Sequence, residues 1–497
     1  MDNAPAVSLM PDGLAEVGAW LEGRAERVIE TALARVFLTP DAVFKQKKAV
    51  RFDYVDFSTA EKRHAALARE FEFNRLAAPD IYRAVRRVTR RTDGGLEFDG
   101  PGELADEVLE MRRFADEAVL SANPEAMDGE MAEALGRAIA RYHAEAPRKT
   151  STGLAYTVPS NANVLAALAS ELGEAPVAAL TAATQGQHER LRPLLEARAQ
   201  AGFSRRCHGD LHLGNILVEQ GRPVLFDCIE FNDALSDIDV LYDLAFLLMD
   251  LDFRGRREPA ARVLSGYLDE AARRFPTELW EGLAALPLML SVRAAVRAHV
   301  SAHSGDAHLG RRYLEAAMAH LTPAPPVLVA VGGLSGSGKS TVARRIAPSL
   351  GAAPGAVILR SDEIRKRQAG LAPIEKAPAS AYSAEADAAV FAELFAAAET
   401  LLRAGRAVVL DATFLRPELR SAAQAAARAA GMPFEGLWLA APAEVLEARV
   451  AARSGDASDA GVEVLRSQLT RDPGPMDWRV LDAAGPAEAA AKAALSP

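Results

Sequence analysis

The sequence has few of the features that mark secreted or membrane proteins. Only two cysteines occur among 497 residues, Cys207 and Cys228, so a disulfide framework is excluded. No apolar run reaches the ~20 residues of a membrane-spanning helix, because the nearest approach, residues 241–250, is interrupted by aspartates. The amino terminus lacks a basic start followed by an apolar stretch, so we expect no signal peptide. These absences predict a cytoplasmic protein with no membrane segment.

An excess of positive charge is also missing. Acidic residues outnumber basic ones by 67 to 57, which gives a formal net charge of -10. Such a balance argues against a general affinity for nucleic acid or for anionic membranes. The one basic run, residues 83–91, has no interleaved aromatic residues, and we interpret it as a solvated strand face rather than a nucleic-acid surface.

The length and composition indicate a globular protein with more than one domain. At 497 residues the chain is too long for one ordinary core, and its 49% apolar and 25% charged residues are typical of globular folds. Three prolines in residues 321–326 cannot continue a helix and favour an extended linker. We therefore expect one domain over 1–320, the linker at 321–326, and a second domain over 327–497.

The first domain divides further. Residues 43–47 are strand-like, the SxxE-type pattern starting at Ser58 is typical of a helix start, and residues 81–88 are again strand-like. From about 102 to 320 the apolar pattern is mostly helical. The sequence thus predicts a small strand-rich lobe at about 27–101, followed by a larger helical lobe at about 102–320.

One motif in this domain has the composition that phosphoryl transfer requires. Residues 207–215 read CHGDLHLGN, and an apolar strand that ends in Asp227 follows. Phosphoryl transfer needs a carboxylate to orient the acceptor hydroxyl and oxygen ligands to hold magnesium against the triphosphate. We predict that Asp210 is the catalytic base and that Asn215 and Asp227 are the metal ligands, since protein kinases use the same Asp-to-Asn interval.

These residues resemble those of the aminoglycoside phosphotransferase family, whose loop reads HGDxxxxN. The resemblance continues through residues 230–232 and 239–246 and implies a bilobal, protein-kinase-like fold. It also implies a small-lobe lysine that contacts the phosphates and a helix glutamate that positions this lysine. Lys45 and Lys47 lie on one strand face and either could serve, with Lys45 slightly favoured. We choose Glu70 as the partner, with Glu72 as the competitor.

A second phosphate motif follows the proline linker. Residues 333–340 read GLSGSGKS, a Walker A loop, between an apolar strand and a helix, which is the context that the motif needs. Its backbone N–H groups and the helix dipole are expected to hold phosphates, Lys339 to span the β- and γ-phosphates, and the Ser340 hydroxyl to bind magnesium. The predicted ATP-binding residues here are Gly333, Leu334, Ser335, Gly336, Ser337, Gly338, Lys339, Ser340 and Thr341.

The remainder of this half alternates strands with helices. Strand-like segments at 356–359, 407–410, 434–439 and 478–481 predict a doubly wound parallel sheet of the P-loop NTPase class. Asp411 at a strand end is expected to organise magnesium, and Asp362 to face the acceptor as a base or as a group that binds its hydroxyl. Arg449 and Arg453 are candidates to neutralise charge on the transferred phosphoryl group. The half resembles P-loop kinases of the gluconate-kinase and shikimate-kinase sort, and the whole resembles fusions labelled bifunctional aminoglycoside phosphotransferase/ATP-binding (AAA) proteins.

Three functions follow from these patterns. The first is a bifunctional, ATP- and Mg2+-dependent kinase whose halves each phosphorylate a hydroxyl of a small molecule. In the second, one half turns over and the other is a nucleotide-binding regulatory module. The third, of a different class, is a nucleic-acid-binding or polynucleotide-kinase-like protein, which the acidic charge does not favour. An aminoglycoside as the acceptor is not favoured either, and the sequence leaves the acceptor and the oligomeric state open.

Overall fold

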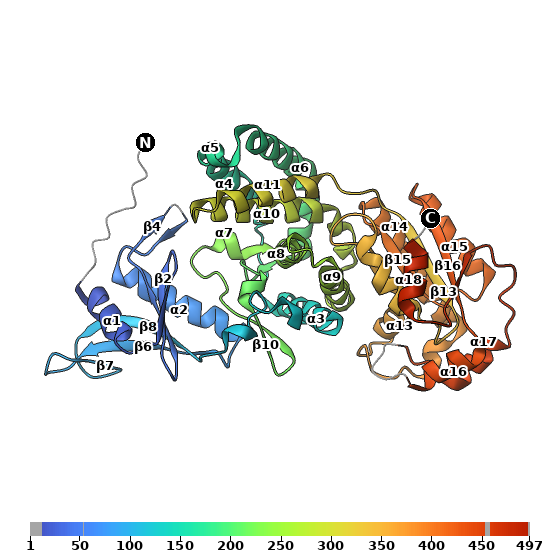
Figure 1. The fold of residues 1–497 in the computed structure, drawn as a ribbon, viewed down its shortest axis with the longest axis horizontal. Coiled ribbons are helices and arrows are strands. Elements are labelled where there is room, and N and C mark those ends of the chain that lie inside the picture. The colour runs from blue at the N-terminus through green and yellow to red at the C-terminus, as the bar shows by residue number, and fades with distance from the viewer. Residues whose placement is uncertain (1–11, 53, 453–457, 496–497) are drawn as a thin grey trace. The chain divides into compact units, whose positions relative to one another are not determined.

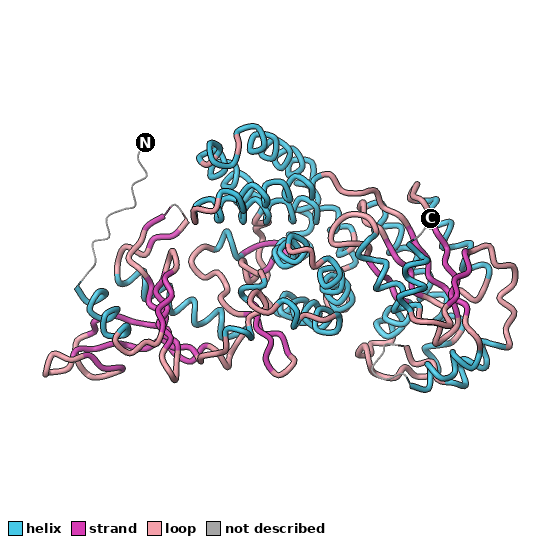
Figure 2. Tube along the Cα trace, in the orientation of Figure 1, coloured by secondary structure: helices cyan, strands magenta, loops and turns pink. Residues whose placement is uncertain are grey.

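The computed structural model describes residues 12–52, 54–452 and 458–495 (Figure 1). They form two compact units. The first unit comprises Met1–Met127, Ala146–Tyr156 and Ser204–Asp239, and the second comprises Asp128–Glu145, Thr157–Phe203 and Val240–Pro497. Figure 2 distinguishes the helices of the chain from its strands.

The first unit is built on a six-stranded antiparallel sheet. Its strands, in spatial order, are β1 (Arg27–Glu30), β2 (Ala34–Leu38), β3 (Val43–Lys47), β8 (Leu104–Met111), β6 (Tyr82–Arg90) and β7 (Leu96–Phe98). The predicted strands at 43–47 and 81–88 therefore exist. The sheet also extends past the boundary expected at about residue 101, because β8 pairs with both β3 and β6. The sequence of β8, LADEVLEM, alternates charged and apolar residues too irregularly for the strand to be recognised from pattern alone.

One helix of the first unit carries Glu70 beneath the sheet. Helix α2 (Ala60–Ala77) begins at Thr59, whose hydroxyl accepts a hydrogen bond from the backbone N–H of Lys62. The predicted helix start is confirmed, but the capping residue is Thr59, one position after the Ser58 at which the predicted capping pattern begins. Glu70 and Asn74 lie one turn apart on α2 and are both fully buried, so this face of the helix is polar inside the protein.

The other elements of the first unit include the hairpin that follows the loop of residues 207–215. The hairpin β10 (Ile216–Glu219) and β11 (Arg222–Leu225) follows that loop and leads to Asp227. The small pairs are β4 (Arg51–Phe52) with β5 (Val55–Asp56) and β9 (Ser204–Arg206) with β12 (Asp237–Asp239). The remaining helical elements are α1 (Asp12–Glu22), η1 (Asp116–Ala118), η2 (Pro124–Ala126), η3 (Leu213–Asn215) and α7 (Asp233–Ser236).

The second unit contains a helical region and a parallel sheet. The helices of the helical region are α3 (Gly129–Glu145), α4 (Leu154–Ala167, of the second unit from Thr157 on), α5 (Ala169–Leu172), α6 (Glu174–Ala201), α8 (Val240–Phe253), α9 (Arg257–Ala271), α10 (Leu286–His303) and α11 (Ala307–Leu321). Two short 3-10 turns, η4 (Thr277–Leu279) and η5 (Glu281–Ala285), precede α10. Helices α3 and α9 approach closely at two glycines. A Cβ on Gly136 would lie 2.1 Å from the Val263 carbonyl oxygen, and a Cβ on Gly266 would lie 2.3 Å from the Glu133 carbonyl oxygen.

One segment in the described part of the chain, Thr277–His303, is long and apolar enough to cross a membrane by length and composition alone. The structure buries 72% of its most apolar window inside the protein. A core helix passes the same test, so the apolar character of this segment is accounted for by its packing.

The parallel sheet of the second unit has the strand order β14 (Val357–Arg360), β15 (Val408–Asp411), β13 (Leu328–Gly333), β16 (Phe434–Ala440) and β17 (Arg479–Asp482). Its helical elements are α12 (Lys339–Ile346), η6 (Ala347–Ser349), α13 (Ser361–Gln368), η7 (Ala379–Tyr382), α14 (Ala384–Arg403), α15 (Pro417–Ala429), α16 (Ala443–Ala452), α17 (Val462–Leu469) and α18 (Ala487–Leu495). All neighbouring strands are parallel, as predicted for the doubly wound fold.

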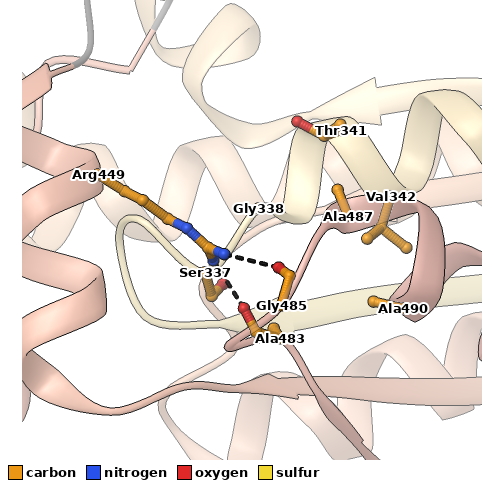
Figure 3. A pocket seen from close by; sticks show the side chains of 9 residues that line it. All are labelled: Ser337, Gly338, Thr341, Val342, Arg449, Ala483, Gly485, Ala487 and Ala490. Carbon is orange, nitrogen blue, oxygen red and sulfur yellow. Dashed lines mark hydrogen bonds between the residues drawn. The ribbon is translucent and has the colours of Figure 1, made fainter.

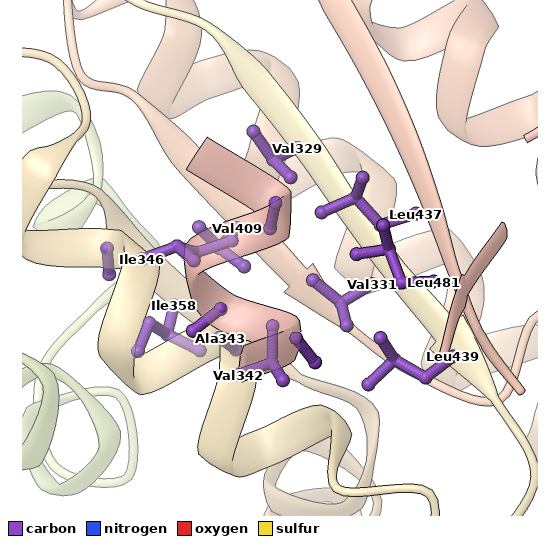
Figure 4. Close-up of a cluster of buried hydrophobic side chains, with 14 of the residues drawn as sticks. Val329, Val331, Val342, Ala343, Ile346, Ile358, Val409, Leu437, Leu439 and Leu481 are labelled. Carbon is purple, nitrogen blue, oxygen red and sulfur yellow. The ribbon is translucent and has the colours of Figure 1, made fainter. Parts of the chain in front are cut away.

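Strands β13, β14 and β15 are almost entirely apolar and are buried along their length, as is typical of a parallel sheet with helices on both faces. Figure 4 shows Val329, Val331 and Leu437 of the strands packed with Val342 and Ile346 of α12. Alanines of α18 complete this core, and α14 and α15 contact the sheet strands β14, β15 and β16. Because the strands are parallel, their carboxyl ends lie at one edge of the sheet, and the loops at this edge carry the polar residues of the candidate site.

Candidate active sites

The catalytic loop of the first unit brings two predicted residues into contact. Asn215 Nδ2 donates hydrogen bonds to the Asp210 carbonyl oxygen at 2.9 Å and to Asp210 Oδ2 at 3.1 Å. His212 Nε2 lies 3.4 Å from Asp210 Oδ2. Since the amide nitrogen of Asn215 is used by Asp210, the amide oxygen is the atom that remains for a cation. The Asp210 side chain is 37% exposed, so it is open to solvent.

His208 connects this loop to the segment that carries Asp227. Its Nε2 donates to the Phe226 carbonyl oxygen at 2.8 Å, and its Nδ1 accepts from the Asp210 backbone N–H at 3.3 Å. The Phe226 backbone N–H also donates to the Asn215 carbonyl oxygen at 3.1 Å. The two segments that carry Asp210, Asn215 and Asp227 are therefore fixed side by side by backbone hydrogen bonds.

Asp227 has an unusual backbone conformation that its neighbours hold in place. Its φ of 63° lies in the left-handed region, which non-glycine residues seldom adopt. The Asp227 backbone N–H donates to the Tyr82 hydroxyl at 3.0 Å, and the Cys228 N–H donates to Asn74 Oδ1 at 2.7 Å. Tyr82 and Asn74 are thus part of this site. They do not stand out in the sequence because their partners lie about 150 residues away.

The two candidate lysines of β3 occupy different positions. Lys45 Nζ lies 2.6 Å from Glu70 Oε1 and 2.7 Å from Asp227 Oδ1. Lys47 Nζ lies 2.5 Å from Glu70 Oε2 and 2.6 Å from Glu230 Oε1, and its side chain is only 3% exposed. Glu70 is therefore shared by both lysines, whereas Glu72 is exposed on the opposite side of α2. Of the two lysines, Lys45 is the one in contact with the predicted metal ligand.

The charges of this cluster shift one another's ionisation. Burial alone would raise the pKa of Glu70, but the ammonium groups of Lys45 and Lys47 outweigh it and lower that pKa to about 2. Burial likewise opposes the charged form of Lys45, yet Asp227 and Glu70 hold its pKa well above the ordinary value. Burial raises the pKa of Glu230, with Lys47 acting against it. Lys45 and Glu70 therefore remain charged at neutral pH.

The Walker A loop of the second unit joins β13 to α12. Gly333, Gly336 and Gly338 all have positive φ, and a Cβ on Gly336 would lie 2.7 Å from the Leu446 carbonyl oxygen, so the loop requires glycine there. Lys339 Nζ donates to the Leu334 carbonyl oxygen at 3.0 Å, across the loop. The Ser335 N–H donates to Gln468 Oε1 of α17 at 2.9 Å, a contact that the sequence did not reveal. The buried Ser337 hydroxyl has no hydrogen-bond partner within the described part of the chain, as expected of a loop shaped for a polar ligand.

Three polar side chains meet next to this loop. Arg360, at the end of β14, donates from NH2 to Ser340 Oγ at 3.3 Å and from Nε to Asp411 Oδ2 at 3.3 Å. Ser340 and Asp411, the two predicted magnesium ligands, thus lie on either side of one guanidinium. Asp362 follows at the start of α13. Burial raises its pKa above the ordinary 3.8, and although the Arg360 charge opposes this shift, the Asp411 charge adds to it.

A cavity of about 180 Å³ adjoins the Walker A loop (Figure 3). It is lined by Ser337, Gly338, Thr341, Val342, Arg449, Ala483, Gly485, Ala487 and Ala490. In the described part of the chain, the hydrogen bonds of Arg449 go to residues 483–485 and not to Lys339 or Ser340. It donates to the carbonyl oxygens of Ala483 at 2.7 Å and Gly485 at 2.8 Å, which Figure 3 shows at the cavity wall. The other candidate arginine, Arg453, lies outside the described residues.

The basic run of residues 83–91 is largely paired with carboxylates. Arg83 and Arg86 both contact Glu110, Arg86 also contacts Asp99, Arg90 contacts Glu16 and Arg91 contacts Asp93. These partners neutralise most of the positive charge that a nucleic-acid surface would need. The interpretation of this run as a strand face is confirmed, since it lies on β6.

Comparisons with known proteins agree with both constellations. Residues 35–285 match the model of the phosphotransferase enzyme family, and residues 328–473 match that of an AAA domain. Uncharacterized proteins of Mycobacterium tuberculosis (strain H37Rv) and Mycobacterium bovis are each 30% identical over 485 residues, which is 93% of this chain and 93% of each relative.

Solved structures resemble one part or the other. A choline kinase from Cryptosporidium parvum Iowa II is 12% identical with a TM-score of 0.39 and covers 62% of this chain and 92% of its own. A glucosamine kinase in complex with glucosamine, ADP and inorganic phosphate is 18% identical with a TM-score of 0.35 and covers 64% and 83%. A gluconokinase from Sinorhizobium meliloti 1021 is 24% identical with a TM-score of 0.24 and covers 34% and 90%.

This protein is an ATP-dependent kinase. The two family matches define this class, and the kinase-like set of residues in the first unit and the Walker A loop in the second agree with it. More narrowly, the chain belongs to the phosphotransferase enzyme family, whose model spans about half of it, and carries a P-loop kinase-like domain after that region.

Proposed function

We propose that the chain is a bifunctional phosphotransferase in which each half transfers the γ-phosphoryl group of ATP to a hydroxyl of a small molecule. The observation that carries this proposal is that each half holds its own complete set of polar side chains. In the first unit these are Asp210, Asn215, Asp227, Lys45 and Glu70, and in the second unit Lys339, Ser340, Asp411 and Asp362.

In the first half, Asp210 orients the acceptor hydroxyl and takes its proton. The bond from the acceptor oxygen to the γ-phosphorus forms as the bond from that phosphorus to the β–γ bridging oxygen breaks. Lys45, held by Glu70, supplies a fixed positive charge for the phosphates. Asn215 and Asp227 offer the amide and carboxylate oxygens that suit Mg2+, which when bound would neutralise charge on the triphosphate.

In the second half, the glycine loop and Lys339 receive the phosphates, and the alanine-rich cavity beside Thr341 and Val342 receives the nucleoside. Ser340 and Asp411 are the oxygen donors that would hold Mg2+, and the Arg360 guanidinium lies in contact with both of them. Asp362 is the candidate base, because a partly buried carboxylate with a raised pKa accepts a proton more readily than an ordinary exposed one. Arg449 shapes the cavity wall in this proposal.

Two single substitutions in the full-length chain test the proposal. Asp210→Asn and Lys339→Ala would each be incubated with MgATP and a library of hydroxyl metabolites, and products would be detected by the mass gain of one phosphoryl group. We expect each change to abolish a different set of products. The controls are Asp80→Asn and Lys492→Ala, which alter exposed residues of the same type. If either change alone abolished all products, only one half would be a kinase, and the other would be a regulatory module.

A further inference from the structure

Next to the candidate base Asp362 lies a second carboxylate that no step of the proposed reaction uses. Glu363 is in the first turn of α13, and its side chain is 3% exposed. Arg137 NH2 of α3 lies 2.9 Å from Glu363 Oε1, and Arg273 NH2, two residues after α9, lies 3.1 Å from Glu363 Oε2. Both arginines come from the helical region of the second unit, 226 and 90 residues away in sequence.

Arg273 contacts α13 in its first turn and also contacts the segment that follows the helix. Besides its contact with Glu363 in the first turn, its NH1 donates to the carbonyl oxygen of Leu371 at 2.6 Å, just beyond the last residue of the helix. A planar guanidinium that holds two separated groups restricts the helix more than a single ion pair does. The placement of α13 relative to the sheet therefore depends on a residue outside the P-loop domain.

The same carboxylate faces the magnesium side of the site. Arg360 NH1 lies 4.0 Å from Glu363 Oε1, while other nitrogens of the same guanidinium contact Asp411 and Ser340. A continuous set of charged contacts thus runs from α3 and the end of α9, through Glu363 and Arg360, to the Walker A serine. Asp362 lies between Arg360 and Glu363 in sequence, so these contacts hold the backbone on both sides of it.

We propose that Glu363 is a positioning residue of the second active site, and that Arg137 and Arg273 of the helical region hold it in place. The proposal rests on the proposed function of the P-loop half. In this proposal the helical region of the phosphotransferase domain supplies two arginines that position a residue of the P-loop kinase site. The second activity therefore depends on residues that lie outside the P-loop domain.

A purely structural role is the competing explanation, in which these ion pairs only attach the helical region to the P-loop domain. The chain offers a control for this possibility. Arg257 of α9 donates to the carbonyl oxygens of Gly351 at 2.9 Å and Pro354 at 3.3 Å, so it attaches the same two regions away from α13. Removing Arg257 weakens attachment without touching Glu363, Asp362 or Arg360.

The experiment uses full-length chains that carry Asp210→Asn to silence the first site. Phosphate release from MgATP, with water as the acceptor, would be measured together with the Kd for MgATP in the parent and in Glu363→Gln, Glu363→Asp, Arg273→Ala and Arg257→Ala. We expect Glu363→Gln and Arg273→Ala to lower kcat by about tenfold or more, since small misplacements of a catalytic group are costly, with Kd within about threefold of the parent. Glu363→Asp should recover part of the rate.

Hydrogen exchange of residues 361–368 adds a readout that does not depend on turnover. It should become faster in Glu363→Gln and Arg273→Ala and stay unchanged in Arg257→Ala. An unchanged kcat in Glu363→Gln, or an equal loss in Arg257→Ala, would overturn the positioning role. Failure of the proposed function is recognised separately, because Lys339→Ala in the same background would then leave phosphate release unaltered.

Discussion

Lys45 Nζ lies 2.6 Å from Glu70 Oε1 in the first unit, although the two residues are 25 positions apart on a strand and a helix. The same ammonium contacts Asp227, whereas Lys47, two residues on, is turned to Glu70 and Glu230. The two lysines therefore occupy different environments: Lys45 lies beside the predicted metal ligand Asp227, and Lys47 lies inside a buried ion cluster with Glu70 and Glu230.

We expect Lys45→Met to impair mainly catalysis and Lys47→Met to impair mainly stability. Lys45→Met should reduce kcat/KM of the first site by at least ~100-fold, the scale on which fixed charges act on a transition state, with little loss of stability because Lys47 still pairs with Glu70. Lys47→Met should lower the free energy of unfolding by about 3–5 kcal/mol, since it leaves Glu230 buried without its cation.

Urea unfolding and phosphoryl transfer, both measured in a Lys339→Ala background, separate the two effects. If Lys47→Met abolished turnover at full stability while Lys45→Met kept it, the assignment of the two lysines would be reversed.

Arg449 is expected to act on nucleotide affinity rather than on the chemical step. Because its guanidinium holds the carbonyl oxygens of Ala483 and Gly485 at the cavity wall, Arg449→Ala should loosen that wall, raise the Kd for MgATP at the second site several-fold and change kcat by less than about threefold. Calorimetric titration in an Asp210→Asn background measures the affinity. Arg466→Ala, at an exposed arginine paired with Glu447, is the control. A fall in kcat of a hundredfold or more would instead support direct neutralisation of the transferred group.

The close approach of α3 and α9 makes Gly136 intolerant of a side chain. A Cβ there would lie 2.1 Å from the Val263 carbonyl oxygen and 2.7 Å from the Tyr267 backbone nitrogen, and backbone atoms of a packed helix cannot move aside cheaply. We expect Gly136→Ala to lower the free energy of unfolding by about 1–3 kcal/mol. Gly186→Ala, at an exposed position of α6 with nothing within 4 Å of the added Cβ, should instead raise the free energy of unfolding by about 0.5–1 kcal/mol. Equal shifts in the two variants, measured by thermal or urea unfolding, would contradict this reading of the helix contact.

Asp269 should make stability depend on pH. Burial, and then the charge of Glu363, raise its pKa from 3.8 to about 7, with Arg137 acting against them. The folded state thus keeps a proton that the unfolded state loses between about pH 4 and pH 7, so this group lowers the free energy of unfolding as pH rises through that window. The loss is complete above about pH 7.

Asp269→Asn removes this dependence, and the variant should gain stability relative to the parent as pH rises from 4 to 8. Urea unfolding at several pH values checks the trend, with Asp80→Asn at an exposed aspartate as the control. Parallel curves for Asp269→Asn and the parent would show that Asp269 ionises alike in both states.

Sequence patterns located both phosphate motifs and most of the elements around them. Both motifs, the glycines of residues 333–338 and the interval from Asp210 to Asn215, lie within short segments, so they can be recognised in the sequence alone. Strand β8 was missed because its alternation is irregular, and it became a central strand only through pairing with β3 and β6. The choice between Lys45 and Lys47 could not be made from one strand, since both face the same side.

What the sequence by itself determined was the local chemistry: a carboxylate-and-amide loop, a glycine-rich phosphate loop, and the periodicities of the strands and helices that carry them. What only the tertiary structure decided was which charges meet. The deciding contacts join residues that are 20 to 226 positions apart in the sequence. They place Glu70 between two lysines, Arg360 between Ser340 and Asp411, and Glu363 between Arg137 and Arg273. Such pairings depend on how helices and sheets pack, and no local pattern of residues records them.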